Sequence, residues 1–139
     1  MCCDGSLFGR VPLAPAEMES ARRNGLRIVG DGAFEQPCAA LVARSCSVYP
    51  ERPLSCRRFV CRLHERHRTE GGPLEARLEA VRRVRELVAY LETSGWTRGD
   101  FQLKRPAALA RAPGTRAAEA FAELARRLEE DFARPCSAS

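Results

Sequence analysis

The sequence lacks any run of about 18 apolar residues, the length that a membrane-spanning helix needs. Its opening stretch, MCCDGSLFGR, also lacks the basic region and the apolar segment of a signal peptide. We therefore expect no membrane segment and no export, and we place the protein in the cytoplasm. In that reducing compartment, clustered cysteines more often bind metal or do redox chemistry than form disulfides.

The common catalytic motifs are missing as well. There is no Gly-rich phosphate loop, no HExxH pattern, no Ser-His-Asp set and no pair of acids at a defined spacing. Asp4 and Glu51 lie close to cysteines in the chain, but a lone acid beside a turn is usually solvated. The sequence alone therefore leaves open whether the protein is an enzyme.

Cysteine is absent from the 74 residues between Cys61 and Cys136. The other six cysteines lie in the first 61 residues, which are also rich in proline and glycine, whereas the rest of the chain is rich in arginine, alanine, leucine and glutamate. A chain of 139 residues with 45% hydrophobic residues can form one modest core. We expect a single domain over residues 1–139, with a cysteine-cluster half at 1–70 and a helical half at 71–139.

Two segments of the second half have apolar residues at every third or fourth position, which predicts two helices. The first begins at Pro73, expected at the first helical position, and stops at Gly95. The second runs from about Thr115 to Ala133, after the Pro113-Gly114 turn signal. The residues between the two helices form a connection that could hold a short helical turn. Both apolar stripes are expected to form core, with no chemical role.

The first half gives weaker signals. Residues 14–25 predict a short helix closed by Asn24-Gly25, and residues 26–36 predict a small hairpin around Gly30-Asp31-Gly32. Residues 37–46 could hold one or two helical turns, and residues 56–68 could form a helix. So little regular structure needs another source of stability, and metal coordination is one such source.

The cysteine pattern in the first half points to metal. Thiolates hold zinc as four tetrahedral ligands or hold an iron–sulfur cluster, and either site gathers sulfurs from separate segments. The spacing is neither the paired CxxC of a zinc ribbon nor a ferredoxin run, so it indicates a metal without choosing between zinc and an iron–sulfur cluster. The alternative is a set of buried thiols that act as small hydrophobic side chains.

Arginines surround the cysteine segment CSVYPERPLSCRRFVC, residues 46–61. From Arg52 to Arg68 there are six arginines and one glutamate, an excess of five that equals the net charge of the chain. Four thiolates around zinc or a common cluster leave a net negative charge. We therefore expect Arg52, Arg57 and Arg58 to offset this charge and to donate hydrogen bonds to the ligand sulfurs.

Nucleic-acid binding is the competing explanation of these arginines. The segment shows neither interleaved aromatic residues nor a base-reading motif, so we do not expect a nucleic-acid partner. His64 and His67 follow Cys61 closely and could be ligands, but histidines in a polar stretch are more often exposed.

The segment CSVYPERPLSCRRFVC resembles the C-x-(I/V)-Y-x-x-R-P-x-x-C-R-x-F-x-C signature of the YkgJ-type cysteine-cluster family of zinc- or iron-chelating domain proteins. QPCAAL, residues 36–41, is similar to that family's preceding cysteine segment, and CCDGSLF, residues 2–8, to the end of its opening CxxCxxCC motif. The resemblance covers residues 2 to about 68. It implies metal ligands at the six cysteines of the first half, which are Cys2, Cys3, Cys38, Cys46, Cys56 and Cys61. Cys136 has no counterpart and is expected to be a free thiol.

One departure concerns the opening motif. The family has two further cysteines, three and six residues before its Cys-Cys pair, whereas Met1 directly precedes the pair here. Either six thiols suffice, or the start was placed too late in the reading frame; we expect the second.

Three functions remain open. The first is a metal-chelating module with a structural or metal-handling role, which the sequence favours. The second is an iron–sulfur redox or group-transfer enzyme, or an accessory protein to one; a related type, the flagellin lysine methylases, is associated with such a cluster. The third is a nucleic-acid or regulatory binder with a structural metal. The expected fold is mainly α, with loops, short helices and one small hairpin around the metal, packed against a C-terminal helical pair.

Overall fold

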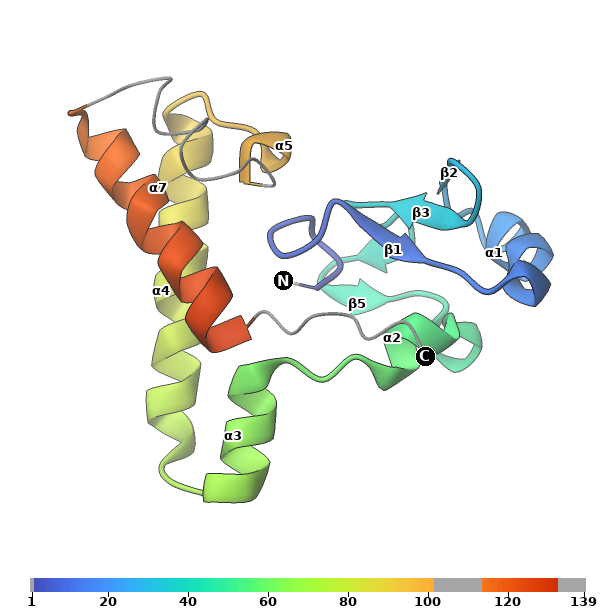
Figure 1. Ribbon diagram of the computed structural model, residues 1–139, viewed down its shortest axis with the longest axis horizontal. Coiled ribbons are helices and arrows are strands. Elements are labelled where there is room, and N and C mark those ends of the chain that lie inside the picture. The colour runs from blue at the N-terminus through green and yellow to red at the C-terminus, as the bar shows by residue number, and fades with distance from the viewer. Residues whose placement is uncertain (1, 102–113, 133–139) are drawn as a thin grey trace. The chain divides into compact units, whose positions relative to one another are not determined.

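A computed structural model describes residues 2–101 and 114–132 (Figure 1). The fold is mainly α, with a few short antiparallel strands. The chain divides into two compact units at the bond between Phe59 and Val60. This boundary precedes the one expected near residue 70, so Cys61 belongs to the second unit. That the two units form one domain stays a prediction.

A small antiparallel sheet lies in the first unit (Figure 1). Its order is β1 (Arg10–Pro12), β3 (Ala33–Glu35) and β2 (Ile28–Val29). The β2–β3 hairpin confirms the hairpin predicted from residues 26–36, whereas β1 was not predicted. Both Val11 and Ile28 pair with Phe34 across the sheet, and Phe34 is only 1% exposed. The middle strand thus places its aromatic ring in the core.

The predicted short helix at residues 14–25 is confirmed. It consists of a 3-10 turn, η1 (Pro15–Glu17), and helix α1 (Met18–Arg23), and the positive φ of 75° at Gly25 follows its end. Ala21 of this helix belongs to the small hydrophobic core of the first unit. The buried members of this core are Leu13, Ala21, Leu26, Phe34 and Ala40, with Cys38 and Cys56 among the half-buried side chains packed against it.

The helical turns predicted for residues 37–46 are wrong. These residues form a second hairpin, with β4 (Leu41–Val42) antiparallel to β5 (Ser45–Cys46). The turn consists of Ala43 and Arg44, whose φ angles are 45° and 69°. Two-residue hairpin turns of type I′ need positive φ at both central residues, and Asn or Gly usually supplies it. Alanine and arginine gave no such signal in the sequence.

The single helix suggested for residues 56–68 is interrupted. A 3-10 turn, η2 (Tyr49–Glu51), leads to α2 (Leu54–Arg58), and α3 (Arg62–Glu70) begins after an extended stretch. The backbone leaves the helical region at Phe59, whose ψ is 120°. Its ring packs edge-on against Phe8 with 5.1 Å between ring centroids. This long-range contact accompanies the break in the helical pattern.

The second unit contains the two long predicted helices, and both are confirmed. α4 (Leu74–Thr93) ends just before Gly95, and α7 (Arg116–Arg127) begins after Thr115, whose side chain accepts a hydrogen bond from Ala118 N–H. Pro73 precedes α4 as its cap instead of opening its first turn. The short turn expected in the connection is α5 (Arg98–Phe101). The predicted positions Pro113 and Ala133 lie outside the described residues.

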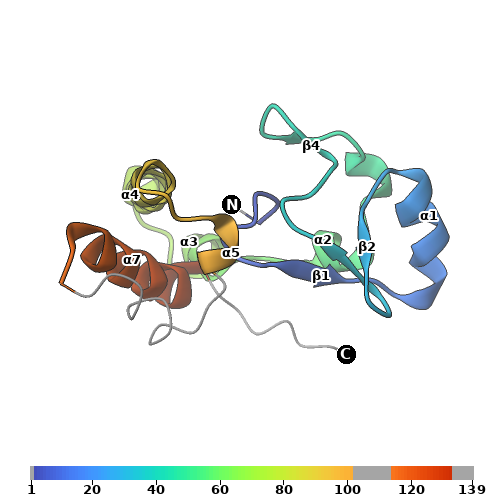
Figure 2. The ribbon, with the colours of Figure 1, turned by 90° about the horizontal axis from the view of Figure 1, so that it is seen from above.

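Helices α4 and α7 lie side by side, and α3 contacts both α4 and the π-helical turn η3 (Leu128–Phe132) (Figure 1 and Figure 2). The rings of Trp96 and Phe121 stack with 4.9 Å between centroids. The stripe of α7 and the second half of the α4 stripe are largely buried as predicted, with Val84, Leu91 and Leu124 fully inaccessible. At the start of α4 the core prediction is wrong, because Leu74 and Leu78 are 56% and 42% exposed. Among the described helices, none combines the length and the apolar character needed to cross a membrane.

A bidentate ion pair also joins α4 to α7. Arg83 Nε and Nη2 donate to the two carboxylate oxygens of Glu123 at 2.9 and 2.6 Å, and Arg127 Nε donates to Glu123 Oε1 at 2.8 Å. The hydrogen bonds from Arg83, then those from Arg127, lower the pKa of Glu123 from 4.5 to about 2.

The Arg83–Glu123 ion pair predicts that the stability of the second unit depends on pH. Because the pKa of Glu123 is lower in the folded state, its stabilisation is complete above pH 4.5 and is lost as the pH falls toward about 2. Glu123→Gln should lower the free energy of unfolding by roughly 1 kcal/mol at neutral pH, a difference that shrinks in acid. Thermal unfolding across this range measures it, with exposed Glu119→Gln as the control. A deficit that persists unchanged at low pH would contradict the assignment.

Candidate metal centre

Five of the six predicted ligands come from four separate segments of the first unit, and the sixth, Cys61, belongs to the second unit. Cys3 and Cys38 are joined through their backbones, because Cys38 N–H donates to the carbonyl oxygen of Cys3 at 2.8 Å. Gly5, with a φ of 81°, lies against Pro37, where a Cβ would stand 3.4 Å from the ring. The positive φ favours glycine here, and the contact with Pro37 keeps the opening segment next to Cys38.

The β4–β5 hairpin brings Cys46 back toward Cys38. Leu41 pairs with Cys46 across the two strands, and Leu41 N–H donates to the carbonyl oxygen of Cys38 at 3.0 Å. Ser47 closes the open end of the hairpin, since its N–H and hydroxyl donate to Ala40 O at 2.9 and 3.1 Å. Backbone pairing therefore determines the separation of these two cysteines.

Cys56 lies on α2, the fourth segment. Ser55 fixes this helix to the sheet by donating its hydroxyl to Pro12 O at 2.7 Å. Arg57 fixes it to the preceding turn, because Nε donates to Arg52 O at 2.8 Å and Nη2 to Pro50 O at 3.0 Å. The side chain of Cys56 is half-buried and packs against the hydrophobic core.

The thiols of Cys3, Cys38 and Cys46 lie close enough to Cys56 to influence its ionisation. Burial raises the pKa of the Cys56 thiol to about 12, with further upward contributions from the charges of Cys3, Cys38 and Cys46. Burial also raises the pKa of Cys3, and Cys38 is the next cause. Cys3, Cys38, Cys46 and Cys56, called here the four-thiol cluster, thus form one electrostatic group within the first unit.

The Cys38 sulfur differs from the others in its surroundings. Burial raises its pKa, while hydrogen bonds from the backbone N–H groups of Ala40 and Leu41 act to lower it. Such N–H donors favour a thiolate over a thiol. They are the kind of support that a metal-bound cysteine uses around its sulfur.

Cys2 and Cys61 have different settings. Cys2 is half-buried and adjoins Cys3 in the chain. Cys61 belongs to the second unit and caps α3, where its sulfur accepts a hydrogen bond from His64 N–H at 3.5 Å. The six described cysteines form no disulfide, and Cys136 lies outside the described residues. That Cys2 and Cys61 are ligands stays a prediction.

The predicted supporting arginines have three different positions. The Arg52 guanidinium lies 3.9 Å above the Tyr49 ring, and its charge lowers the pKa of Cys56 against the larger effect of burial. Arg57 instead binds the backbone carbonyls described above. Arg58 is exposed at the end of α2. Arg52 is therefore the arginine whose charge reaches the cluster, and the role of the other two stays a prediction.

Two histidines considered as ligands lie on α3. His64 is exposed, while His67 is half-buried and its Nδ1 has no hydrogen-bond partner among the described residues. Across residues 2–101 and 114–132, no three His, Cys, Asp or Glu side chains are gathered closely enough to hold a metal ion. The fit of the four-thiol cluster to a metal thus rests on its donor chemistry, four sulfurs with N–H support at Cys38.

Two residues that organise this region were not predicted. Ser55 ties α2 to β1, and Glu17 accepts the N–H of Leu54 at the start of α2. Pro53 offers no capping side chain before that helix, which is a local sign that a distant acceptor is needed. Nothing in the sequence shows which acceptor it is.

Comparisons with known protein families, curated proteins and solved structures find no match for this chain. The resemblance to the YkgJ-type family therefore stays a prediction.

The burial of the thiols predicts an alkaline transition in the metal-free protein. Because the pKa of Cys56 rises from 9.0 to about 12 on folding, its neutral thiol stabilises the fold fully below pH 9.0 and this stabilisation is lost as the pH approaches 12. Limited proteolysis between pH 8 and 11 should show the first unit opening as the pH rises. Cys56→Ser, which does not ionise, should open less; equal opening of both proteins would refute the prediction.

Proposed function

We propose that the first unit is a metal-binding module that holds zinc or an iron–sulfur cluster through cysteine thiolates. The four-thiol cluster supports this proposal, because the charges of Cys3, Cys38 and Cys46 all act on Cys56, and Cys38 and Cys56 pack against the same small core. Four thiolates suit a closed tetrahedral zinc site and also the ligand set of a common iron–sulfur cluster.

The electrostatics of the cluster support a cationic ligand. Burial raises the pKa of Cys56 to about 12, and the charges of Cys3, Cys38 and Cys46 add to the cost of ionising it. A bound cation would remove this repulsion, because a coordinating thiol is deprotonated by the ion. Metal binding would then release protons and add directly to the stability of the first unit.

A structural or metal-handling role is the form of this proposal that the described residues favour. Cys38 and Cys56 pack against the hydrophobic core, so an ion held by them would link core and loops. A closed site of four protein ligands leaves no open position for a substrate. Enzymatic activity is therefore not part of the proposal.

Removing a ligand should also remove local structure. We expect Cys46→Ser or Cys56→Ser to abolish metal binding and to make the first unit sensitive to protease, because the site's binding energy is also folding energy. The second unit should remain helical, since α4 and α7 bury their own core. Metal content and limited proteolysis, before and after chelation, measure both effects.

Cys136→Ser serves as the control, and Cys61→Ser tests a further predicted ligand. Cys136→Ser should change neither metal content nor proteolysis. Cys61→Ser preserves the cap of α3, because serine is a good helix cap, so a loss of metal in that variant would report ligation and not loss of the helix. A Cys56→Ser protein that stays fully metallated and protease-resistant would overturn the proposal.

Anaerobic purification decides which metal is bound. A brown protein with acid-labile sulfide would identify an iron–sulfur cluster, whereas a colourless protein with stoichiometric zinc would identify a zinc site. A protein that holds neither, and takes up neither on reconstitution, would exclude the function proposed here.

A further inference from the structure

Helix α2, which carries Cys56, has no capping side chain of its own. The residue before it is Pro53, and the helix is only five residues long. The N–H of Leu54, at its first position, therefore needs an acceptor from elsewhere in the chain. So short a helix is not stable alone, and its position depends on the groups that hold it.

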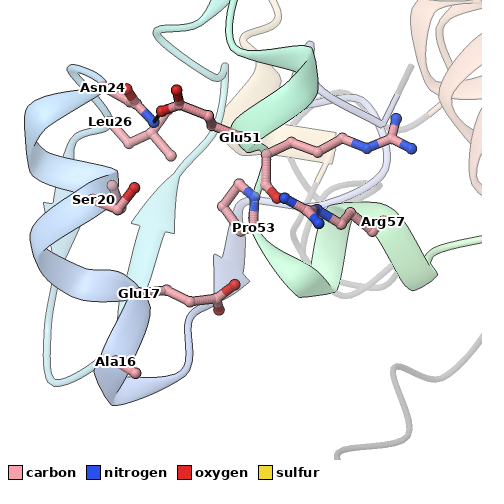
Figure 3. A pocket seen from close by; sticks show the side chains of 10 residues that line it. Ala16, Glu17, Ser20, Asn24, Leu26, Glu51, Pro53 and Arg57 are labelled. Atoms are coloured by element: carbon pink, nitrogen blue, oxygen red, sulfur yellow. Dashed lines mark hydrogen bonds between the residues drawn. The ribbon is translucent and has the colours of Figure 1, made fainter.

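Glu17 supplies this acceptor from a distant point in the sequence. Its Oε1 accepts the N–H of Leu54 at 2.7 Å across 37 residues, and its Oε2 accepts the N–H of Ala14 at 3.0 Å. One carboxylate thus joins the start of η1 to the start of α2. Figure 3 shows the Glu17 side chain directed from the helical segment toward the Pro53 side of α2.

A cavity lies beside the start of α2. Glu17 and Arg57 line this cavity of about 300 Å³ between α1 and residues 51–57 (Figure 3). Asn24 Nδ2 donates a hydrogen bond to Glu51 Oε2 at 3.2 Å, and both residues line the same cavity. Because space separates the two segments, polar bridges connect them there.

We propose that Glu17 is a positioning residue for the metal centre, acting by holding α2 so that Cys56 faces the other three thiols. This inference rests on the function proposed above. Ser55 holds the same helix from the sheet, while Glu17 holds its first turn through an ionised acceptor. Hydrogen bonds to a charged group are stronger than neutral ones.

The test compares Glu17→Gln with Glu19→Gln. Leu54 and Ala14 donate to different oxygens of Glu17, and glutamine has an acceptor at only one of these two positions, because its other polar atom is a donor. Glu19 is an exposed neighbour that pairs with Arg23, so it controls for the loss of charge. Each metal-free protein is treated with a thiol-alkylating reagent, and the labelling rate of each cysteine is read by peptide mass mapping.

We expect Glu17→Gln to raise the labelling rate of Cys56 about tenfold, with Cys38 and Cys46 unchanged, because one charge-assisted hydrogen bond is lost. Glu19→Gln should label like the unsubstituted protein. An equal rise at all the thiols would mean general loss of folding, and no rise at Cys56 would mean that Glu17 does not hold α2. Either result overturns the inference.

Titration with Co²⁺ then connects this position to the metal. Thiolate–cobalt absorption should appear in the unsubstituted protein, and the affinity should fall about tenfold in Glu17→Gln but not in Glu19→Gln. Equal affinities in all three proteins would overturn the role of Glu17 at the site. Absence of Co²⁺ binding by the unsubstituted protein would count against the metal-binding function itself, while the labelling of Cys56 still decides how α2 is held.

Discussion

The small hydrophobic core is the constraint on which the first unit depends. Its buried side chains, Leu13, Ala21, Leu26, Phe34 and Ala40, include two alanines, and the strands around them are two or three residues long. Domains near this size bury too little apolar surface to be more than marginally stable. Backbone hydrogen bonds and polar bridges therefore do much of the positioning of segments in this unit.

The second unit gains its stability in another way. Its helices bury apolar side chains, the Trp96–Phe121 stack connects the segment after α4 with α7, and the Arg83–Glu123 pair connects α4 with α7. Here burial supplies the main stabilisation and the ion pair adds a smaller share. The two units thus differ in the source of their stability, and the seven cysteines follow that difference, with five of them in the first unit.

The sequence predicts what is local and periodic. α4 and α7 follow from their apolar repeats, and the β2–β3 hairpin follows from the glycines of its turn. The β4–β5 hairpin was missed because Ala43 and Arg44 occupy left-handed conformations without a glycine or asparagine to indicate them. At the candidate site the cysteines could be named in advance, but the group that orients α2 could not. Glu17 is 37 residues from the N–H it accepts, and periodicity carries no information over such a distance.

The hydrogen bond from Cys38 to Cys3 has a consequence for the order in which the protein is made. This bond, the β1–β3 pairing, the β4–β5 hairpin and the bridge from Glu17 to Leu54 all join residues that precede Val60. A chain emerging from the ribosome therefore contains every partner of these contacts before α4 and α7 have been synthesised. Because units generally fold in the order of synthesis, the four-thiol cluster can assemble on the nascent chain, while translation of the helical unit is still under way.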